Sequence, residues 1–274
     1  MQDAFIVKFN TNGLRQWGRY YGGPENDFGN KIVVSQNSNL YIAGQTTSES
    51  GIATINSHQE QFGSIDISDS DGFLSKLDLN GNIIWGTYYG GDYIDEVNAL
   101  NVDNNGNIII TGVTSSSNNI ATPGEYQSTI ASAYDGFLAK FNSNGVRICG
   151  TYYGGSDDDR INSVAVKSND DIVIVGMTYS EDNIATAGAH QEIFGNGSND
   201  NSDGFFAILT DNPVIDIVNI EPINICQGGT AVITFIVTNG SFQSGNIFSA
   251  QLSDINGDFD NYTVVGTFEG TGSG

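Results

Sequence analysis

The chain has 274 residues, and its 32 Asp and Glu against 9 Lys and Arg give a formal net charge of −23 at pH 7. This balance argues against nucleic acid as a partner, because nucleic-acid binding needs a basic surface. It also disfavours adsorption to anionic lipid. No run of about 20 apolar residues occurs, so the sequence contains no membrane-spanning segment.

Three near-copies of one segment follow one another along the chain. Each copy opens with Asp-Ala-Phe or Asp-Gly-Phe and later reaches Tyr-Tyr-Gly-Gly. The copies begin at Asp3, Asp71 and Asp135, and a partial fourth begins at Asp203. Self-similarity at a nearly fixed spacing indicates a repeat scaffold, because a single unit of this kind cannot bury its own apolar face.

The third copy predicts four short strands in chain order. A strand over 137–141 precedes a hairpin signal at 142–145, where Asn and Gly accept a positive φ, and a second strand over 146–153. A third strand is expected over 161–166 and a fourth over 172–176. Nothing in the sequence has a helical period with caps. Four short antiparallel strands per unit are typical of a β-propeller blade.

A longer connector ends each copy. It opens with Ile-Ala-Thr and reaches a Gln seven residues after the Ile, at Gln59, Gln127 and Gln191. The copies differ in length only in this connector, which indicates a surface loop outside the blade core.

The strand count predicts how the blades are grouped. If a blade combines strands two, three and four of one copy with strand one of the next, the blades cover about 14–77, 82–141 and 146–209, and strand 3–9 is left over. Closed propellers need about 4–8 blades. We therefore expect an all-β, open and partial propeller of three four-stranded blades plus one extra strand, with further blades before Met1. The alternative is a ring that the three copies close with another chain.

A second module follows the repeats. From Pro213 the blade motif does not return, and short alternating strands are separated by Gly-Gly and Asn-Gly. This pattern favours an immunoglobulin-like β-sandwich, although the segment is shorter than the roughly 100 residues of a complete one. The expected domains are propeller repeats over 1–211 and a truncated Ig-like β-sandwich over 212–274, and both ends are expected to be cut.

The recurring motifs carry a family resemblance. The series Asp-x-Phe-x-x-Lys-Phe, Asn-Gly, Trp-Gly-Thr-Tyr-Tyr-Gly-Gly and Gly-Asn-Ile-x-Ile-x-Gly-x-Thr resembles the SBBP repeat, a seven-bladed β-propeller repeat of secreted bacterial proteins. The resemblance covers roughly 1–211. It implies a secreted or cell-surface protein, often with a C-terminal sorting domain for type IX secretion, and most family members have no assigned biochemical activity. No export signal follows Met1, as expected for a fragment.

The most regular polar signal is an Asp four residues after each Gly-Gly, at Asp27, Asp95 and Asp159. One interpretation is that each Asp caps the turn by accepting hydrogen bonds from local backbone N–H groups. The other is a Ca²⁺ site in each blade, with Asp157 and Asp158 as further ligands in the third copy. The Asp-x-Asp-x-Asp-Gly loop of strong calcium sites is absent, which favours the structural interpretation. No other cofactor is expected.

Three further repeat positions are interpreted as structural. They are Trp17, Trp85 and Cys149; Tyr21, Tyr89 and Tyr153; and Asn30, Asn98 and Asn162. Each Asn is expected to tie neighbouring strands together. Cys149 stands where the other copies have Trp, which predicts a buried apolar filler. A disulfide with Cys226 is disfavoured, because it would tie a blade core to another domain.

Residue types that carry chemistry do not form a catalytic pattern. His58 and His190 are equivalent, but Tyr126 takes their place in the middle copy, so a packing role is favoured over catalysis or metal binding. A Lys recurs on the first strand of every copy, whereas a nucleophile is needed only once. These residues, Lys8, Lys76 and Lys140, favour a structural ion pair or an exposed strand face. The chain is not expected to be an enzyme.

The leading hypothesis is a non-catalytic extracellular or cell-surface propeller scaffold that mediates adhesion or binds a glycan or protein. One alternative is a propeller enzyme whose active site lies in blades missing from this fragment. The other is a purely structural spacer. No residue pattern identifies the ligand.

Overall fold

The computed structural model describes residues 2–66, 68–195 and 202–210, and four strands after them. The chain divides into two compact units, Met1–Leu209 and Thr210–Gly274. Every regular element of the described residues is a β-strand, as expected. None of these residues forms a helix long and apolar enough to cross a membrane.

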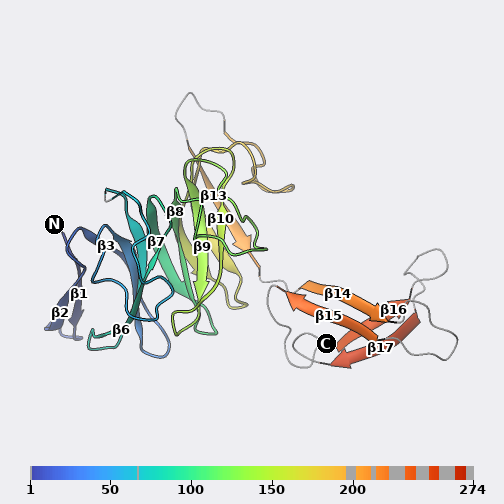
Figure 1. The fold of residues 1–274 in the computed structure, drawn as a ribbon, viewed down its shortest axis with the longest axis horizontal. Helices are drawn as coiled ribbons and strands as arrows, with labels where there is room; N and C mark the ends of the chain where they lie inside the picture. The colour runs from blue at the N-terminus through green and yellow to red at the C-terminus, as the bar shows by residue number, and fades with distance from the viewer. Residues whose placement is uncertain are drawn as a thin grey trace. The chain divides into compact units, whose positions relative to one another are not determined.

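Four antiparallel sheets make up the described part of the first unit, and Figure 1 shows them one beside the next from the N-terminus onward. The first sheet pairs β1 (Ala4–Phe9) with β2 (Arg15–Tyr21). The second consists of β3 (Asp27–Val34), β4 (Leu40–Thr46), β5 (Asp71–Leu77) and β6 (Ile83–Tyr89). The third consists of β7 (Asp95–Val102), β8 (Ile108–Thr114), β9 (Asp135–Phe141) and β10 (Arg147–Tyr153). The fourth consists of β11 (Asp159–Val166), β12 (Ile172–Thr178) and β13 (Asp203–Leu209).

The expected grouping of strands into blades is wrong. The described residues form two four-stranded sheets, one of three strands and one of two, rather than three four-stranded blades and one extra strand. A blade combines strands three and four of one copy with strands one and two of the next. The reason is the tight turn after strand one: Gly81 has φ +77° and its N–H donates to the Asp78 carbonyl, which keeps β5 and β6 in one sheet. The chain passes to the next sheet at Tyr-Tyr-Gly-Gly instead.

The core lies between the sheets. Strands β3, β7 and β11 open successive sheets and make the close contacts from one sheet to the next. The run Ile108-Ile109-Ile110 on β8 is fully buried, with the outer two residues packed toward β4 and β5 and the middle one toward β11 and β12. Alternate side chains of a strand point to opposite faces, so a strand buried between two sheets can carry a continuous apolar run such as this one.

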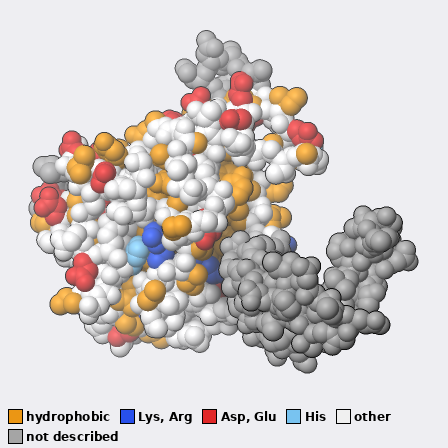
Figure 2. Space-filling model, turned by 45° about the vertical axis from the view of Figure 1, so that its right-hand side comes forward, with side chains coloured by type: hydrophobic (Ala, Val, Ile, Leu, Met, Phe, Trp, Pro, Cys, Tyr) orange, Lys and Arg blue, Asp and Glu red, His pale blue; other side chains and the backbone are white. Residues whose placement is uncertain are grey.

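The two outermost sheets expose residues that the inner sheets bury. Phe5 is 73% exposed, whereas the equivalent Phe73 and Phe137 are 0% exposed. At the other end, Phe206 on β13 is 70% exposed. Hydrophobic side chains therefore reach the surface of the described part, as the orange atoms in Figure 2 show.

A β-bulge interrupts the first strand of each sheet from the second onward. The extra residue in the bulge is Asn30, Asn98 or Asn162, since pairing passes directly from the residue before it to the residue after it. A Gly faces the bulge from the neighbouring strand. At Gly112 an added Cβ would overlap the Glu96 carbonyl oxygen, so only Gly fits here.

The described residues of the second unit form two antiparallel strand pairs. They are β14 (Val214–Glu221) with β15 (Val232–Thr238), and β16 (Ile247–Leu252) with β17 (Thr263–Glu269). Cys226 lies outside the described residues.

Replacing the bulge glycine tests this packing. Gly112→Ala should destabilise the protein by roughly 2–3 kcal/mol, because the new methyl group overlaps backbone that cannot move aside. In a thermal melt this corresponds to a loss of roughly 5–10 °C. Gly18→Ala is the matched control, since its Cβ would lie 3.6 Å from Val7 Cγ2, an ordinary contact. Equal melting temperatures for the two variants would contradict the close packing of Gly112 against the bulge.

Candidate functional site

The Asp residues proposed as calcium ligands lie buried at the first position of β3, β7 and β11. Asp95 Oδ2 accepts hydrogen bonds from the Gly91 N–H at 2.7 Å and the Ser116 hydroxyl at 2.8 Å. Asp27 and Asp159 accept the same pair of bonds from their own Gly and Ser. Each carboxylate therefore fixes the Gly-Gly turn, which is the structural role considered above.

The extra acids of the third copy point elsewhere. Asp157 is exposed and Asp158 half-buried, while Asp159 beside them is buried. Among the described residues no group of three or more His, Cys, Asp or Glu lies close enough together to hold a metal ion. The known contacts of these residues thus favour the structural interpretation, and calcium binding stays a prediction to be tested.

Burial perturbs these carboxyl groups. The Asp71 and Asp95 carboxyl groups both lie close to Gly90. Burial raises the pKa of Asp71 to about 6 and that of Asp95 to about 7, against hydrogen bonds that lower both, and the charge of Asp71 raises the Asp95 value further. Burial also raises the pKa of the equivalent Asp135 and Asp159.

The bulge asparagines join neighbouring sheets rather than neighbouring strands of one sheet. Asn30 Nδ2 donates to the Val97 carbonyl at 2.9 Å, and Asn98 Nδ2 donates to the Ile161 carbonyl at 3.1 Å. Val97 and Ile161 each precede the Asn of the next bulge. Asn162, on the last sheet described, is exposed. Asn30 and Asn98 therefore each link their own bulge to the bulge of the following sheet.

The second tyrosine of each Tyr-Tyr pair, just before Gly-Gly, also joins neighbouring sheets. Its ring packs on the Phe of the next Asp-x-Phe, with centroids 5.0–5.3 Å apart. Its hydroxyl donates to the carbonyl of the Ile that opens the next connector, as from Tyr89 to Ile120 at 2.8 Å. The three contacts pair Tyr21 with Phe73 and Ile52, Tyr89 with Phe137 and Ile120, and Tyr153 with Phe205 and Ile184.

The Trp position also points toward the next sheet. Trp17 Nε1 donates to the Leu79 carbonyl at 3.2 Å, and Trp85 Nε1 donates to the Ser143 carbonyl at 3.3 Å. Leu79 and Ser143 lie in the hairpin turns of the following sheets. Cys149 is half-buried rather than the buried filler that the sequence predicted. A Trp at this position is therefore a hydrogen-bond donor as well as an apolar group.

The lysines and His58 have structural partners, whereas His190 is exposed beside the last described sheet of the first unit. Lys8 and Lys76 donate to the same two turns that the tryptophans reach. Lys140 is buried and forms an ion pair with Asp103 at 3.3 Å. The His58 ring packs against Tyr89 and Phe141, and Tyr126 stacks on Tyr153 in the equivalent place. Burial lowers the pKa of His58 to about 4, so its imidazole is neutral at physiological pH.

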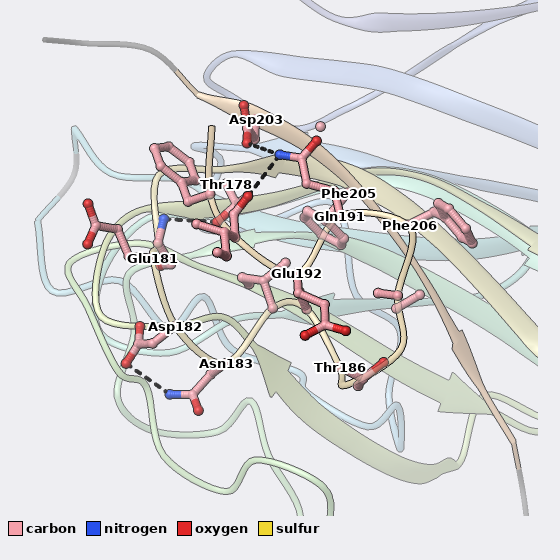
Figure 3. Close-up of a pocket in the computed structure, with 18 of the residues that line it drawn as sticks. Thr178, Glu181, Asp182, Asn183, Thr186, Gln191, Glu192, Asp203, Phe205 and Phe206 are labelled. Carbon is pink, nitrogen blue, oxygen red and sulfur yellow. Dashed lines mark hydrogen bonds between the residues drawn. The ribbon is translucent and has the colours of Figure 1, made fainter. Parts of the chain in front are cut away.

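A cavity of about 570 Å³ opens beside β13, between this strand and the connector 180–194. We call it the β13 groove. Figure 3 shows Gln191 joined to Asp203 by a dashed line, with Phe205 and Phe206 nearby. Gln191 Nε2 donates to Asp203 Oδ2 at 2.9 Å. The connector side of the groove carries apolar residues, among them Ile184, Ile193 and Phe194, and the Gln191–Asp203 hydrogen bond joins this side to β13.

The sequence reasoning did not identify this groove. Two signals were present: a Gln at a fixed place in every connector, and a fourth Asp-Gly-Phe with no Tyr-Tyr-Gly-Gly after it. The role of the Gln depends on a hydrogen-bond pattern that only the structure displays.

Repeated sheets of this kind define a class, that of β-propeller repeat proteins. A family model described as the SBBP beta-propeller repeat matches residues 16–51, from β2 through β4, and the chain thus carries this repeat, as the resemblance implied.

Curated relatives are distant. The chain is 24% identical over 146 residues to an uncharacterized WD repeat-containing protein of Acanthamoeba polyphaga mimivirus, a match that covers 50% of this chain and 10% of that protein. It is 25% identical over 178 residues to the regulatory protein FlaEY of Caulobacter vibrioides, covering 64% of this chain and 18% of that protein. The matches thus span less than a fifth of each relative.

The buried carboxyl groups predict how stability depends on pH. Between the ordinary value of 3.8 and the raised values of Asp71 and Asp95, the folded protein binds more protons than the unfolded chain. Their contribution to stability is therefore complete below about pH 4 and falls as the pH rises to about 7. The melting temperature should be lower at pH 8 than at pH 5, and Asp95→Asn should reduce that difference. Asp157→Asn, at an exposed position, should leave the difference in melting temperature unchanged. If Asp157→Asn reduced the difference and Asp95→Asn did not, the pH dependence would not come from the buried carboxyl groups.

Calcium titration tests the alternative role of the same residues. If Asp27, Asp95 and Asp159 only fix turns, millimolar Ca²⁺ should change the melting temperature by less than about 1 °C, since a ligand raises stability only when it binds the folded state. A larger rise that disappears in Asp159→Asn would establish a calcium site instead.

Proposed function

We propose that this chain is part of a non-catalytic scaffold, secreted or displayed at the cell surface, that mediates adhesion or binds a glycan or protein. The coarser conclusion, a β-propeller scaffold, rests on the repeated sheets and the SBBP match. The finer proposal rests on the resemblance to exported repeat proteins and on how the repeated polar residues are used.

One observation carries the proposal: the tyrosine contact recurs at all three junctions between sheets. The Asp, Asn and Trp positions likewise bond to backbone groups within or between sheets. Residues that repeat in this way are used for architecture. Function is then expected in the loops at the rims, as in other rigid platforms.

We further propose that the sheets belong to an open segment of a larger propeller. Phe5 is exposed, but its equivalents on inner sheets are covered by a tyrosine from the preceding sheet. A further blade would cover it in the same way. The second unit is proposed to be an Ig-like spacer or a second binding module, joined to the propeller for export by a type IX route.

Two other functions stay open. An enzyme would need one blade that departs from the others, with acids or histidines directed to the central channel. A spacer would bind no ligand at all. The names of the two relatives, a WD repeat-containing protein and a regulatory protein, do not distinguish these possibilities.

The test is ligand binding by the complete natural protein. On glycan arrays and on immobilised extracellular-matrix and cell-surface proteins, we expect saturable binding that charge substitutions in the rim loops reduce at least about tenfold. The same preparation should show no turnover on a panel of glycoside, peptide and ester substrates. Turnover would support the enzyme, and neither binding nor turnover would support the spacer.

A further inference from the structure

Three surface loops meet where the second sheet joins the third. They are residues 63–66 at the end of the first connector, residues 91–94 between β6 and β7, and residues 116–119 at the start of the second connector. Both sheets have four strands, so the exposure of these loops does not come from a missing neighbour. We call the three loops together the Tyr93 rim.

Hydrogen bonds between the loops hold the Tyr93 rim in place. The Ile65 N–H donates to the Asp92 carbonyl at 3.0 Å, and the Asp92 N–H donates to Asn118 Oδ1 at 3.1 Å. The Ser64 hydroxyl donates to the Tyr93 carbonyl at 2.8 Å. A surface that is ordered before a partner arrives loses less conformational freedom on binding.

Tyr93 departs from the repeat. It occupies the position that Glu25 and Asp157 occupy in the other copies, two residues after Gly-Gly. The N–H of each of these residues donates to a serine hydroxyl at 2.9 Å, so the backbone is held in the same way in all three copies. The architecture therefore does not need an aromatic side chain here, which makes Tyr93 a candidate for binding.

Apolar surface is exposed on two of the three loops. Tyr93 is 47% exposed, and Ile65 on the neighbouring loop is 70% exposed. Among the described residues, none forms a hydrogen bond, a ring contact or a cation contact with the Tyr93 side chain. An exposed tyrosine of this kind is typical of the residues that dominate binding at protein interfaces.

The charge of the Tyr93 rim is negative. Its loops contain Asp66 and Asp92 and no Lys or Arg. The Ser68 N–H and hydroxyl donate to Asp66 Oδ1, which holds the pKa of Asp66 below its ordinary value, so this carboxylate is charged at neutral pH. The Asp92 carboxylate accepts no hydrogen bond from the described residues. A cation is attracted both by carboxylates and by the face of an aromatic ring.

The next junction shows this chemistry within the chain itself. Arg160, the second residue of β11, lies with its guanidinium carbon 5.6 Å from the centre of the Tyr134 ring, which precedes β9 in the neighbouring sheet. Arginine is suited to such a contact because its planar guanidinium stacks on an aromatic ring and can donate two hydrogen bonds to one carboxylate.

We propose that the Tyr93 rim is a docking site for an arginine-bearing segment of a partner protein, with a guanidinium stacked on Tyr93 and hydrogen-bonded to the Asp92 carboxylate. Ile65 supplies apolar contact area, and Asp66 attracts a further basic residue of the same segment. The inference rests on the binding role proposed above and names one site and one class of partner for it.

A neutral glycan fits the Tyr93 rim less well. Its hydroxyl groups could form hydrogen bonds to Asp66 and Asp92, but it carries no charge to complement theirs. The formal net charge of −23 favours a basic partner further, because complementary charge raises the rate of association and selects between partners.

The test uses the full chain and a fluorescently labelled dodecapeptide of alternating Arg and Ser. Fluorescence anisotropy should show saturable binding, which Tyr93→Ala weakens about fivefold and Tyr93→Phe, which keeps the ring, leaves unchanged. Neither substitution alters the net charge, so a general attraction of the peptide to an acidic protein would not distinguish the two variants. The same peptide with Lys in place of Arg should bind more weakly, because Lys lacks the planar guanidinium.

A pair of charge variants locates the site. Asp92→Asn should weaken the arginine peptide about threefold, as expected for an exposed ion pair. Asp157→Asn is the matched control, since it removes the same charge from the equivalent loop of the next junction, and it should leave binding unchanged. Absence of saturable binding, equal binding by Tyr93→Ala and the unaltered chain, or equal effects of the two Asp variants would overturn the proposal.

The arrays described above separate this proposal from the general binding role. If the complete natural protein binds an array ligand equally well with Tyr93→Ala, the docking site is wrong although the binding role stands. If Tyr93→Ala removes binding to an uncharged glycan, the Tyr93 rim is a glycan site, which overturns the assignment to a basic partner. Absence of binding to both the arrays and the peptide would overturn the site and the binding role together.

Discussion

The rest of the first unit depends on one contact, the tyrosine that closes each sheet and packs on the phenylalanine of the next. Its ring fills the space between two sheets, and its hydroxyl donates to a connector carbonyl. An aromatic ring supplies the buried area, and the hydroxyl removes the cost of burying a polar group. Phenylalanine at this position would supply only the first.

Glycine and asparagine support that contact for geometric reasons. The Gly-Gly after the tyrosines allows the chain to turn to the next sheet, and the buried Asp fixes this turn by accepting the N–H of the second Gly. At the opposite end, the bulge directs an Asn out of its own strand pairing and toward the next sheet. The aromatic contact and the Asn contact add to the hydrogen bonds that Trp and Lys form with the hairpin turns of the next sheet.

Much of this fold could be predicted from the sequence, because the strand pattern, the turns and the repeat are local signals. The position of each Asp, four residues after Gly-Gly, predicted a turn cap, and the hydrogen bonds of these residues agree with it. The predicted grouping of strands into blades was wrong, because the order of strands along the chain does not show where the chain passes from one sheet to the next. The Asn-Gly turn after strand one was the decisive signal, since a tight hairpin keeps the strands on both sides of it in one sheet. The partners of Asn98, Trp85 and Gln59 lie in other strands or other repeats, and no spacing within one copy reveals them.

The side-chain hydrogen bonds between sheets also have a direction. Tyr89, Trp85, Lys76 and Asn30 all donate from an earlier sheet to a later one. The tyrosine contact recurs at all three junctions between the described sheets of the first unit. Gene duplication that inserts or removes a whole repeat leaves this contact at the new junction, so the length of such an array can change during evolution without the invention of a new interface.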